Sequence, residues 1–122
     1  MGNDVRFLLG DKAEKLYFSV LDETSNRKHF PVKFRRLADR MQEYALDIHS
    51  DIMEANGMRT DSVSNKVRRY DTQTRVITRC SKFMSLVKYC LHAKLIGSSL
   101  AEQWAEMIND VKYMTLAWRK ES

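Results

Sequence analysis

Apolar residues recur at helical spacing along most of the chain, and this pattern predicts four helices. The first is expected over residues 11–23, where Asp11 and Glu14 have the spacing of a capping box. Residues 1–10 carry no motif and are expected to form a tail that docks loosely or frays. This first helix is therefore expected to be the shortest of the four.

The second and fourth predicted helices have clear boundaries. The second runs over residues 32–56, because Pro31 suits the first position of a helix and Asn56-Gly57 is a common helix end. The fourth follows the break at Gly97. The core-facing residues expected on these two helices are Phe34, Leu37, Ala38, Met41, Tyr44, Ala45, Ile48, Ile52, Leu100, Trp104, Met107, Ile108, Val111, Met114 and Trp118.

The third predicted helix is the longest and carries both a core face and a charged face. It starts within residues 60–64, which offer several N-caps, and runs to about residue 94 without Gly or Pro. Its expected core face consists of Val63, Val67, Tyr70, Ile77, Met84 and Leu91. On the opposite side, winding at about 100° per residue brings together Arg68, Arg75, Arg79 and Lys82, with Arg69 at the flank.

Four amphipathic helices with short connections predict an all-α fold, an antiparallel up-down-up-down four-helix bundle. At 122 residues and 43% hydrophobic content, the chain is expected to form a single domain over residues 1–122. One short and one long helix would leave an apolar strip uncovered, which favours self-association.

The charge distribution along the chain is uneven. Residues 24–94 contain 15 Lys and Arg against seven Asp and Glu, a net charge of +8, whereas the flanking segments are slightly acidic. A basic segment of this kind suits a polyanion such as nucleic acid. The five residues Arg68, Arg69, Arg75, Arg79 and Lys82 are the predicted nucleic-acid-binding site.

The second helix carries an acidic ladder that complicates this interpretation. Its outer face is expected to present Asp39, Glu43, Asp47, Asp51 and Glu54. If this ladder meets the basic stripe, within one chain or between subunits, protein carboxylates rather than nucleic acid would neutralise part of the stripe. A protein-interaction adaptor, held together by these charges, is therefore an alternative function.

No catalytic, cofactor or metal site is expected. The chain lacks a phosphate-binding glycine loop and the short motifs of hydrolases and metalloproteases, and its three histidines do not form ligand pairs. Cys80 and Cys90, about 15 Å apart on one helix, are expected to be packing thiols. No segment resembles a signal peptide or a membrane span, so a cytoplasmic protein without membrane contact is expected.

Several short segments, in order, resemble one family of small four-helix-bundle proteins. The resembling segments are KAEKLYF at 12–18, F-P at 30–31 followed by L-A-D-R at 37–40, I-M-E-A-N at 52–56, L-I-G-S at 95–98 and V-K-Y-M-T-L-A-W at 111–118. The family includes the accessory variability determinant of diversity-generating retroelements and proteins encoded in intervening sequences of bacterial ribosomal RNA genes.

This resemblance implies a non-enzymatic protein that assembles as a homopentamer with a basic surface. It further implies a role in mutagenic retrohoming beside a reverse transcriptase and its template RNA, so RNA is favoured over DNA.

A third hypothesis is a relaxosome-type accessory protein of a mobile element that binds duplex DNA beside a nicking enzyme.

Overall fold

The structure, a computed structural model, describes residues 2–121, with side chains described from residue 8. Its elements are the α-helices α1 (Gly2–Thr24), α2 (Arg35–Gly57), α3 (Val63–His92) and α4 (Ser98–Glu121), and the short 3-10 helix η1 (Val32–Phe34). No strand occurs in residues 2–121, so the all-α prediction is confirmed. Within the same range, no helix combines the length and apolarity needed to cross a bilayer.

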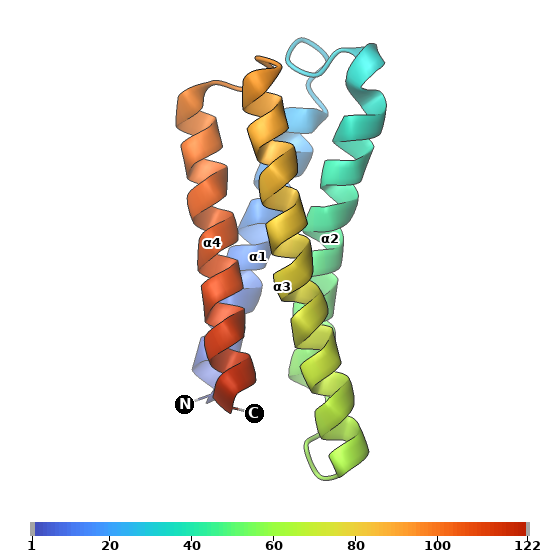
Figure 1. The fold of residues 1–122 in the computed structure, drawn as a ribbon, viewed down its shortest axis with the longest axis vertical. Helices are drawn as coiled ribbons and strands as arrows, with labels where there is room; N and C mark the ends of the chain where they lie inside the picture. The colour runs from blue at the N-terminus through green and yellow to red at the C-terminus, as the bar shows by residue number, and fades with distance from the viewer. Residues whose placement is uncertain (1, 122) are drawn as a thin grey trace.

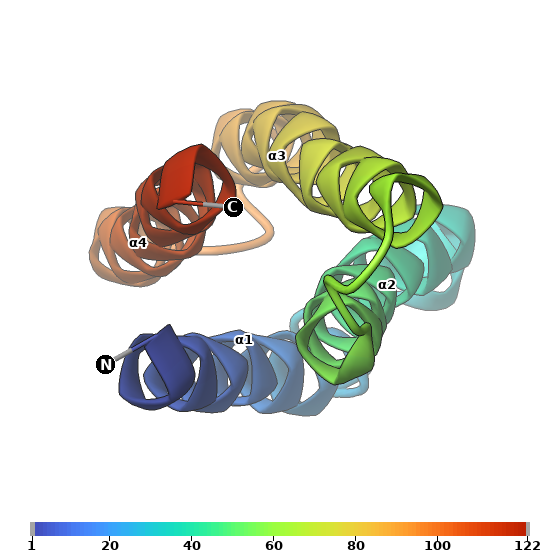
Figure 2. The ribbon, with the colours of Figure 1, turned by 90° about the horizontal axis from the view of Figure 1, so that it is seen from below.

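The four helices pack side by side as a helical bundle. The packed pairs are α1 with α2, α2 with α3, α3 with α4, and α1 with α4. Seen along its length, the bundle is a ring in which the helices follow one another in chain order (Figure 2). The α1–α2 and α3–α4 connections lie at one end, and the α2–α3 connection lies at the other (Figure 1).

The predicted core faces of α2 and α4 are confirmed. The buried residues of these helices, all apolar except Thr115, recur at three- or four-residue spacing, as expected for one face turned to a common core. Trp104 and Trp118 are both almost fully buried, and the Trp104 Nε1 donates a hydrogen bond to the Ser19 hydroxyl of α1 at 2.8 Å. Core burial of this kind stabilises each helix more than its local propensity does.

The first helix begins earlier than the sequence pattern indicated. It starts at Gly2 rather than at Asp11 and is as long as α2, so the expectation of a short first helix is wrong. Of the expected tail, Met1 lies outside the described residues, whereas Leu9 and Gly10 are buried. A Cβ placed on Gly10 would lie 3.0 Å from the Met53 Sδ, so the missing side chain lets α1 approach α2 closely.

The buried face of α3 also differs from the prediction. Val63, Val67, Tyr70 and Leu91 are exposed, Val63 by 79%. The residues buried instead are Arg69, Thr72, Gln73, Val76, Cys80, Phe83, Val87 and Cys90. The helix is therefore turned by about a quarter of a circle relative to the expected orientation.

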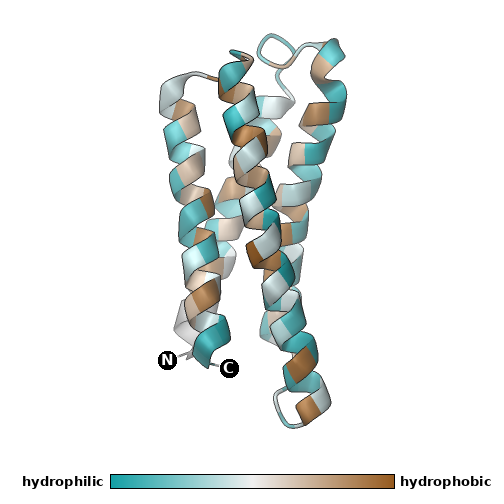
Figure 3. Cartoon of the chain, viewed as in Figure 1, coloured by the Kyte–Doolittle hydropathy of each residue, from teal (hydrophilic) through white to brown (hydrophobic). Residues whose placement is uncertain are grey.

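Two features of α3 explain this error. Its first turns project past the two chain ends (Figure 1), and hydrophobic residues lie on this projecting part (Figure 3). The buried positions near this end are occupied by Arg69, Thr72 and Gln73, all polar. The hydropathy pattern therefore identifies the wrong side of the helix.

The ends of α3 are set by local hydrogen bonds. The Ser62 hydroxyl accepts a hydrogen bond from the Asn65 backbone N–H at 3.1 Å, a standard N-cap within the predicted 60–64 segment. At the other end, Lys94 adopts a left-handed conformation with φ of 61°, and the Leu95 N–H donates to the Cys90 carbonyl at 2.9 Å. This is the hydrogen-bond pattern of a Schellman motif, in which Lys94 occupies the position that usually holds Gly.

Candidate nucleic-acid interface

Two arginines of the predicted binding stripe form ion pairs with the acidic ladder of α2. The Arg75 Nε lies 3.6 Å from the Asp51 Oδ2, and its Nη2 lies 3.6 Å from the Glu54 Oε2. The Arg79 Nη1 donates a hydrogen bond to the Asp51 Oδ2, and its Nη2 lies 3.9 Å from the Asp47 Oδ2. We call these five residues the ion-pair cluster.

The ion-pair cluster answers the question that the sequence left open, because the ladder and the stripe meet within one chain. The Asp51 side chain is only 15% exposed and that of Arg79 28%, so these two charges are partly shielded from water. Charges in such pairs are less available to an external phosphate. They are equally unavailable for the intersubunit pairing that the adaptor hypothesis requires.

Arg69 lies in the core rather than at the flank of the stripe. It is 7% exposed, and its guanidinium carbon lies 5.1 Å from the centroid of the Trp118 ring of α4. This distance is typical of a cation–π contact. Arg69 therefore connects α3 to α4, and its place in the fold makes it a structural residue first.

The two remaining members of the stripe, Arg68 and Lys82, are exposed. Neither makes an ion pair within the part of the chain that the structure describes. They are about 21 Å apart along α3 at 1.5 Å per residue, and the ion-pair cluster lies between them. The predicted stripe is therefore interrupted.

Further cations lie on the part of α2 that precedes the ion-pair cluster. Arg36 lies about three turns before Asp47, and Arg40 lies about three turns before Asp51. Residues separated by whole turns lie on the same side of a helix, and both aspartates contact α3. The two arginines therefore also lie on the side of α2 that faces α3. Lys33 lies in η1, which immediately precedes α2 and packs against it. The α3-facing side of α2 therefore changes from basic in its first half to acidic in its second.

The register between α2 and α3 brings Lys82 to these cations. Arg75 pairs with Asp51, Arg79 pairs with Asp47, and the Phe83 ring stacks on Tyr44 with centroids 6.3 Å apart. Residues nearer the end of α3 therefore contact residues nearer the start of α2. Lys82, beside Phe83, is level with Tyr44, and the Arg40 guanidinium lies 5.4 Å from the Tyr44 ring centroid.

We call Lys33, Arg36, Arg40 and Lys82 the basic surface. All four side chains are exposed, and none forms an ion pair within the described residues. Glu43, also exposed, is the acidic residue that lies between this surface and the ion-pair cluster. The basic surface is therefore the part of the α2–α3 junction where cations form no ion pair within the described residues, although Glu43 lies at its edge.

The sequence contains a signal for the α2 part of this surface that the analysis of the long helix missed. Residues 27–40 hold six Lys and Arg and one acidic residue, Asp39. The net charge summed over residues 24–94 does not reveal this basic run, because the sum also includes the acidic residues of α2. A shorter window would have separated the basic and acidic halves.

The two cysteines are free thiols in the core. Burial raises the pKa of the Cys80 thiol to about 12, with a smaller opposite effect from the Lys112 charge, and burial raises the pKa of Cys90 to about 11. The Cys90 Sγ lies 3.4 Å from the Met41 Sδ. No group of three or more His, Cys, Asp or Glu side chains in the described part of the chain could hold a metal ion.

Comparisons with known proteins identify no relative of this chain. No protein-family model matches the chain, and neither a curated protein nor a solved structure matches it.

Proposed function

We propose that this protein is a non-enzymatic accessory protein that binds nucleic acid through the basic surface. The observation that carries the proposal is the set of four exposed cations, from η1, α2 and α3, that make no ion pair among the described residues. Lys and Arg in this state can neutralise phosphates and release counterions from nucleic acid, which gives salt-dependent affinity. Lys82 and Arg68 are the members of the originally predicted stripe that keep this ability.

The proposal includes an antiparallel, up-down-up-down order of the helices. The opposite direction of residue pairing along α2 and α3 supports it, as does Lys12 of α1 lying 3.5 Å from Asp110 near the middle of α4 while Ser19 bonds Trp104. In this arrangement the start of α2 and the second half of α3 lie at the same level. The basic surface needs that arrangement.

The wider setting rests on the sequence resemblance. We extend the proposal to a homo-oligomer, a pentamer by resemblance, that serves a reverse transcriptase and its template RNA in the cytoplasm. The exposed Val63, Val67, Tyr70 and Tyr113 side chains support self-association, because apolar residues of this size are commonly covered in assemblies. Light scattering across a salt series measures the mass, and an apolar subunit interface should resist salt.

The test of binding compares two variants with equal charge loss. Arg40→Gln/Lys82→Gln removes one cation of the basic surface from each helix, whereas Lys15→Gln/Lys120→Gln removes two exposed cations from α1 and α4. Fluorescence anisotropy with a structured RNA at several salt concentrations should show about tenfold weaker binding for the first variant and a salt slope smaller by about two. The control should stay near wild type.

Three outcomes would count against the proposal. Equal losses in both variants would mean that the total charge matters and the basic surface does not. A preference for duplex DNA over structured RNA of equal length would favour the relaxosome-type alternative. Binding that depends instead on Arg75 and Arg79 would indicate that the nucleic-acid-binding site is the ion-pair cluster rather than the basic surface.

A further inference from the structure

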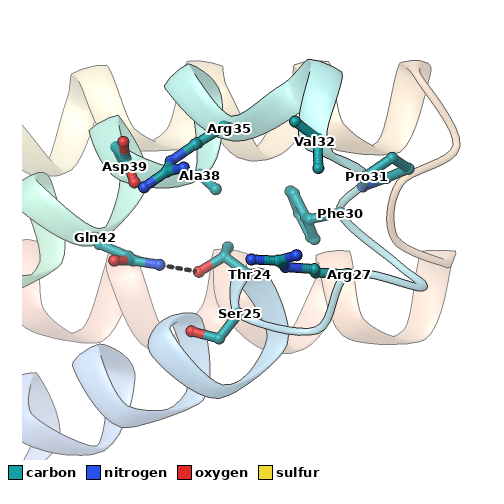
Figure 4. Close-up of a pocket in the computed structure, with 10 residues that line it drawn as sticks. All are labelled: Thr24, Ser25, Arg27, Phe30, Pro31, Val32, Arg35, Ala38, Asp39 and Gln42. Carbon is teal, nitrogen blue, oxygen red and sulfur yellow. Dashed lines mark hydrogen bonds between the residues drawn. The ribbon is translucent and has the colours of Figure 1, made fainter.

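A pocket of about 260 Å³ lies between the end of α1 and the start of α2, on the side of α2 away from α3 (Figure 4). It lies beside the same segment of α2 that carries the basic surface. Ligand sites commonly measure about 300–1,000 Å³, so this pocket admits one small unit and excludes a nucleic-acid duplex. Its walls combine three kinds of side chain, which together indicate the class of ligand.

The first kind is cationic. Arg27, in the α1–α2 connection, reaches over Thr24, and Arg35 runs back along α2 toward Asp39 (Figure 4). Both arginines are exposed, and neither makes an ion pair within the described residues. With two guanidinium groups and one carboxylate among its lining, the pocket has a net positive charge and suits an anion.

Arg35 is the first residue of α2, whose first turn contains no acidic residue and whose N-cap position, Phe34, makes no side-chain capping bond. A cation at a helix start opposes the helix dipole, and Asp39, one turn further along α2, offsets part of this effect (Figure 4). A bound anion would offset more of it. The guanidinium of Arg35 can also bind two oxygens of a phosphate through parallel N–H groups.

The second kind of wall is apolar. Phe30, Pro31, Val32 and Ala38 line the pocket, and the Val32 side chain is 67% exposed. An inorganic anion alone would gain nothing from these residues. A phosphate attached to a sugar and a base would cover them and remove apolar surface from water.

The third kind is polar and held in place. The Gln42 Nε2 donates to the Thr24 hydroxyl at 2.9 Å (Figure 4). That hydroxyl donates in turn to the Val20 carbonyl at 2.6 Å. Thr24 is buried, so this chain of hydrogen bonds fixes the polar wall. A preformed wall lowers the entropic cost of binding a small polar ligand.

From these observations we infer that the pocket binds one unpaired nucleotide of the nucleic acid, with its phosphate between Arg27 and Arg35 and its sugar and base against Pro31, Val32 and Ala38. This inference rests on the proposed function, because the strand that supplies the nucleotide is the one held by the basic surface. Single-stranded regions can turn a base outward, whereas a paired base cannot enter.

The first experiment titrates the isotope-labelled full-length protein with adenosine 5′-monophosphate, adenosine or inorganic phosphate. The monophosphate should shift the Thr24 and Ser25 amide resonances and the Gln42 side-chain amide, with about tenfold higher affinity than either fragment. Arg27→Gln/Arg35→Gln should abolish these shifts. Lys66→Gln/Lys88→Gln, with the same loss of charge from exposed α3 positions, should retain them.

The second experiment measures oligonucleotide binding. A single strand should bind at least about fivefold more tightly than a blunt duplex of equal length, and Ala38→Met, which fills the pocket without changing charge, should remove this preference. The Arg27→Gln/Arg35→Gln variant keeps the test valid if the Ala38 variant does not fold, because both arginines are exposed.

The outcomes separate the two claims. If RNA binds through the basic surface but no ligand shifts the pocket resonances, the pocket inference is wrong and the proposed function stands. If the free monophosphate binds in the pocket but no oligonucleotide binds the protein, the proposed function is wrong, and so is the assignment of the ligand to a strand.

Discussion

Arg79 of α3 donates a hydrogen bond to the Asp51 carboxylate of α2 at the centre of the ion-pair cluster. The Asp51 carboxylate also forms an ion pair with Arg75, so it is the shared partner of two arginines. Because Asp51 is mostly buried, its loss would leave two guanidinium groups without their main partner.

The first prediction follows from that relationship. Asp51→Asn should lower the free energy of unfolding by about 1–3 kcal/mol, because two ion pairs, one of them hydrogen-bonded, are weakened in a partly buried site. Asp71→Asn on the exposed side of α3 should change it by less than about 0.5 kcal/mol. Urea unfolding of both variants measures the difference, and equal values would show that the cluster adds no stability.

The neighbouring Arg68 and Arg69 should behave in opposite ways. Arg69→Ala removes the guanidinium that packs on Trp118 and should cost about 1–3 kcal/mol of stability, with little effect on the salt slope of RNA binding. Arg68→Ala should leave stability within about 0.5 kcal/mol. Thermal unfolding followed by tryptophan fluorescence tests this, and a stable Arg69 variant with weakened RNA binding would contradict it.

Gln73 is fully buried, and its two amide atoms have no hydrogen-bond partner among the described residues. Gln73→Met keeps the length of the side chain and removes the unpaired polar groups, so it should raise the free energy of unfolding by about 1–2 kcal/mol. The exposed Gln103→Met serves as the control, with a change below about 0.5 kcal/mol. A destabilised Gln73 variant would mean that the amide is hydrogen-bonded in solution.

The buried thiols predict a loss of stability at alkaline pH. The thiol pKa values are raised by burial from 9.0 to about 12 for Cys80 and to about 11 for Cys90, so the folded protein keeps both protonated where the unfolded chain ionises. Their contribution is complete below pH 9 and is lost progressively as the pH rises toward 11–12.

The alkaline effect can be isolated by comparing the wild type with Cys80→Ala/Cys90→Ala over pH 8–11. The variant will be less stable at pH 8, and this difference should shrink as the pH rises. A constant difference would show that the thiols do not retain their protons on folding. In the wild type at pH 8, a thiol reagent should react at the rate of unfolding.

Lys94 offers a stabilising substitution. A non-glycine residue at a φ of 61° costs about 1–2 kcal/mol, and Gly avoids most of this strain but loses more entropy on folding. Lys94→Gly should therefore raise the free energy of unfolding by about 0.5–1 kcal/mol. Calorimetry measures the change, with Lys88→Gly, within α3, as a control that should lower stability by a similar amount.

The hydropathy pattern alone determined the helical fold, most helix ends, and the core faces of α2 and α4. These follow from local chemistry, because a stripe of apolar side chains at helical spacing must turn toward a common core. It did not determine that the first helix begins before Leu9, because the capping-box spacing of Asp11 and Glu14 indicated a start at Asp11, although Leu9 continues the apolar spacing of Ala13 and Leu16.

The tertiary structure decided the orientation of α3 and, with it, the state of each predicted binding residue. Val63 and Val67 are exposed because the start of α3 projects beyond the chain ends (Figure 1), whereas Arg69 and Gln73 are buried because they lie on the side of α3 that faces the core. Whether an arginine meets a carboxylate or water depends on the register between two helices. Local sequence does not determine that register. Arg75 and Lys82 therefore occupy equivalent places on the predicted stripe, but in the folded protein Arg75 is ion-paired and Lys82 is exposed to water.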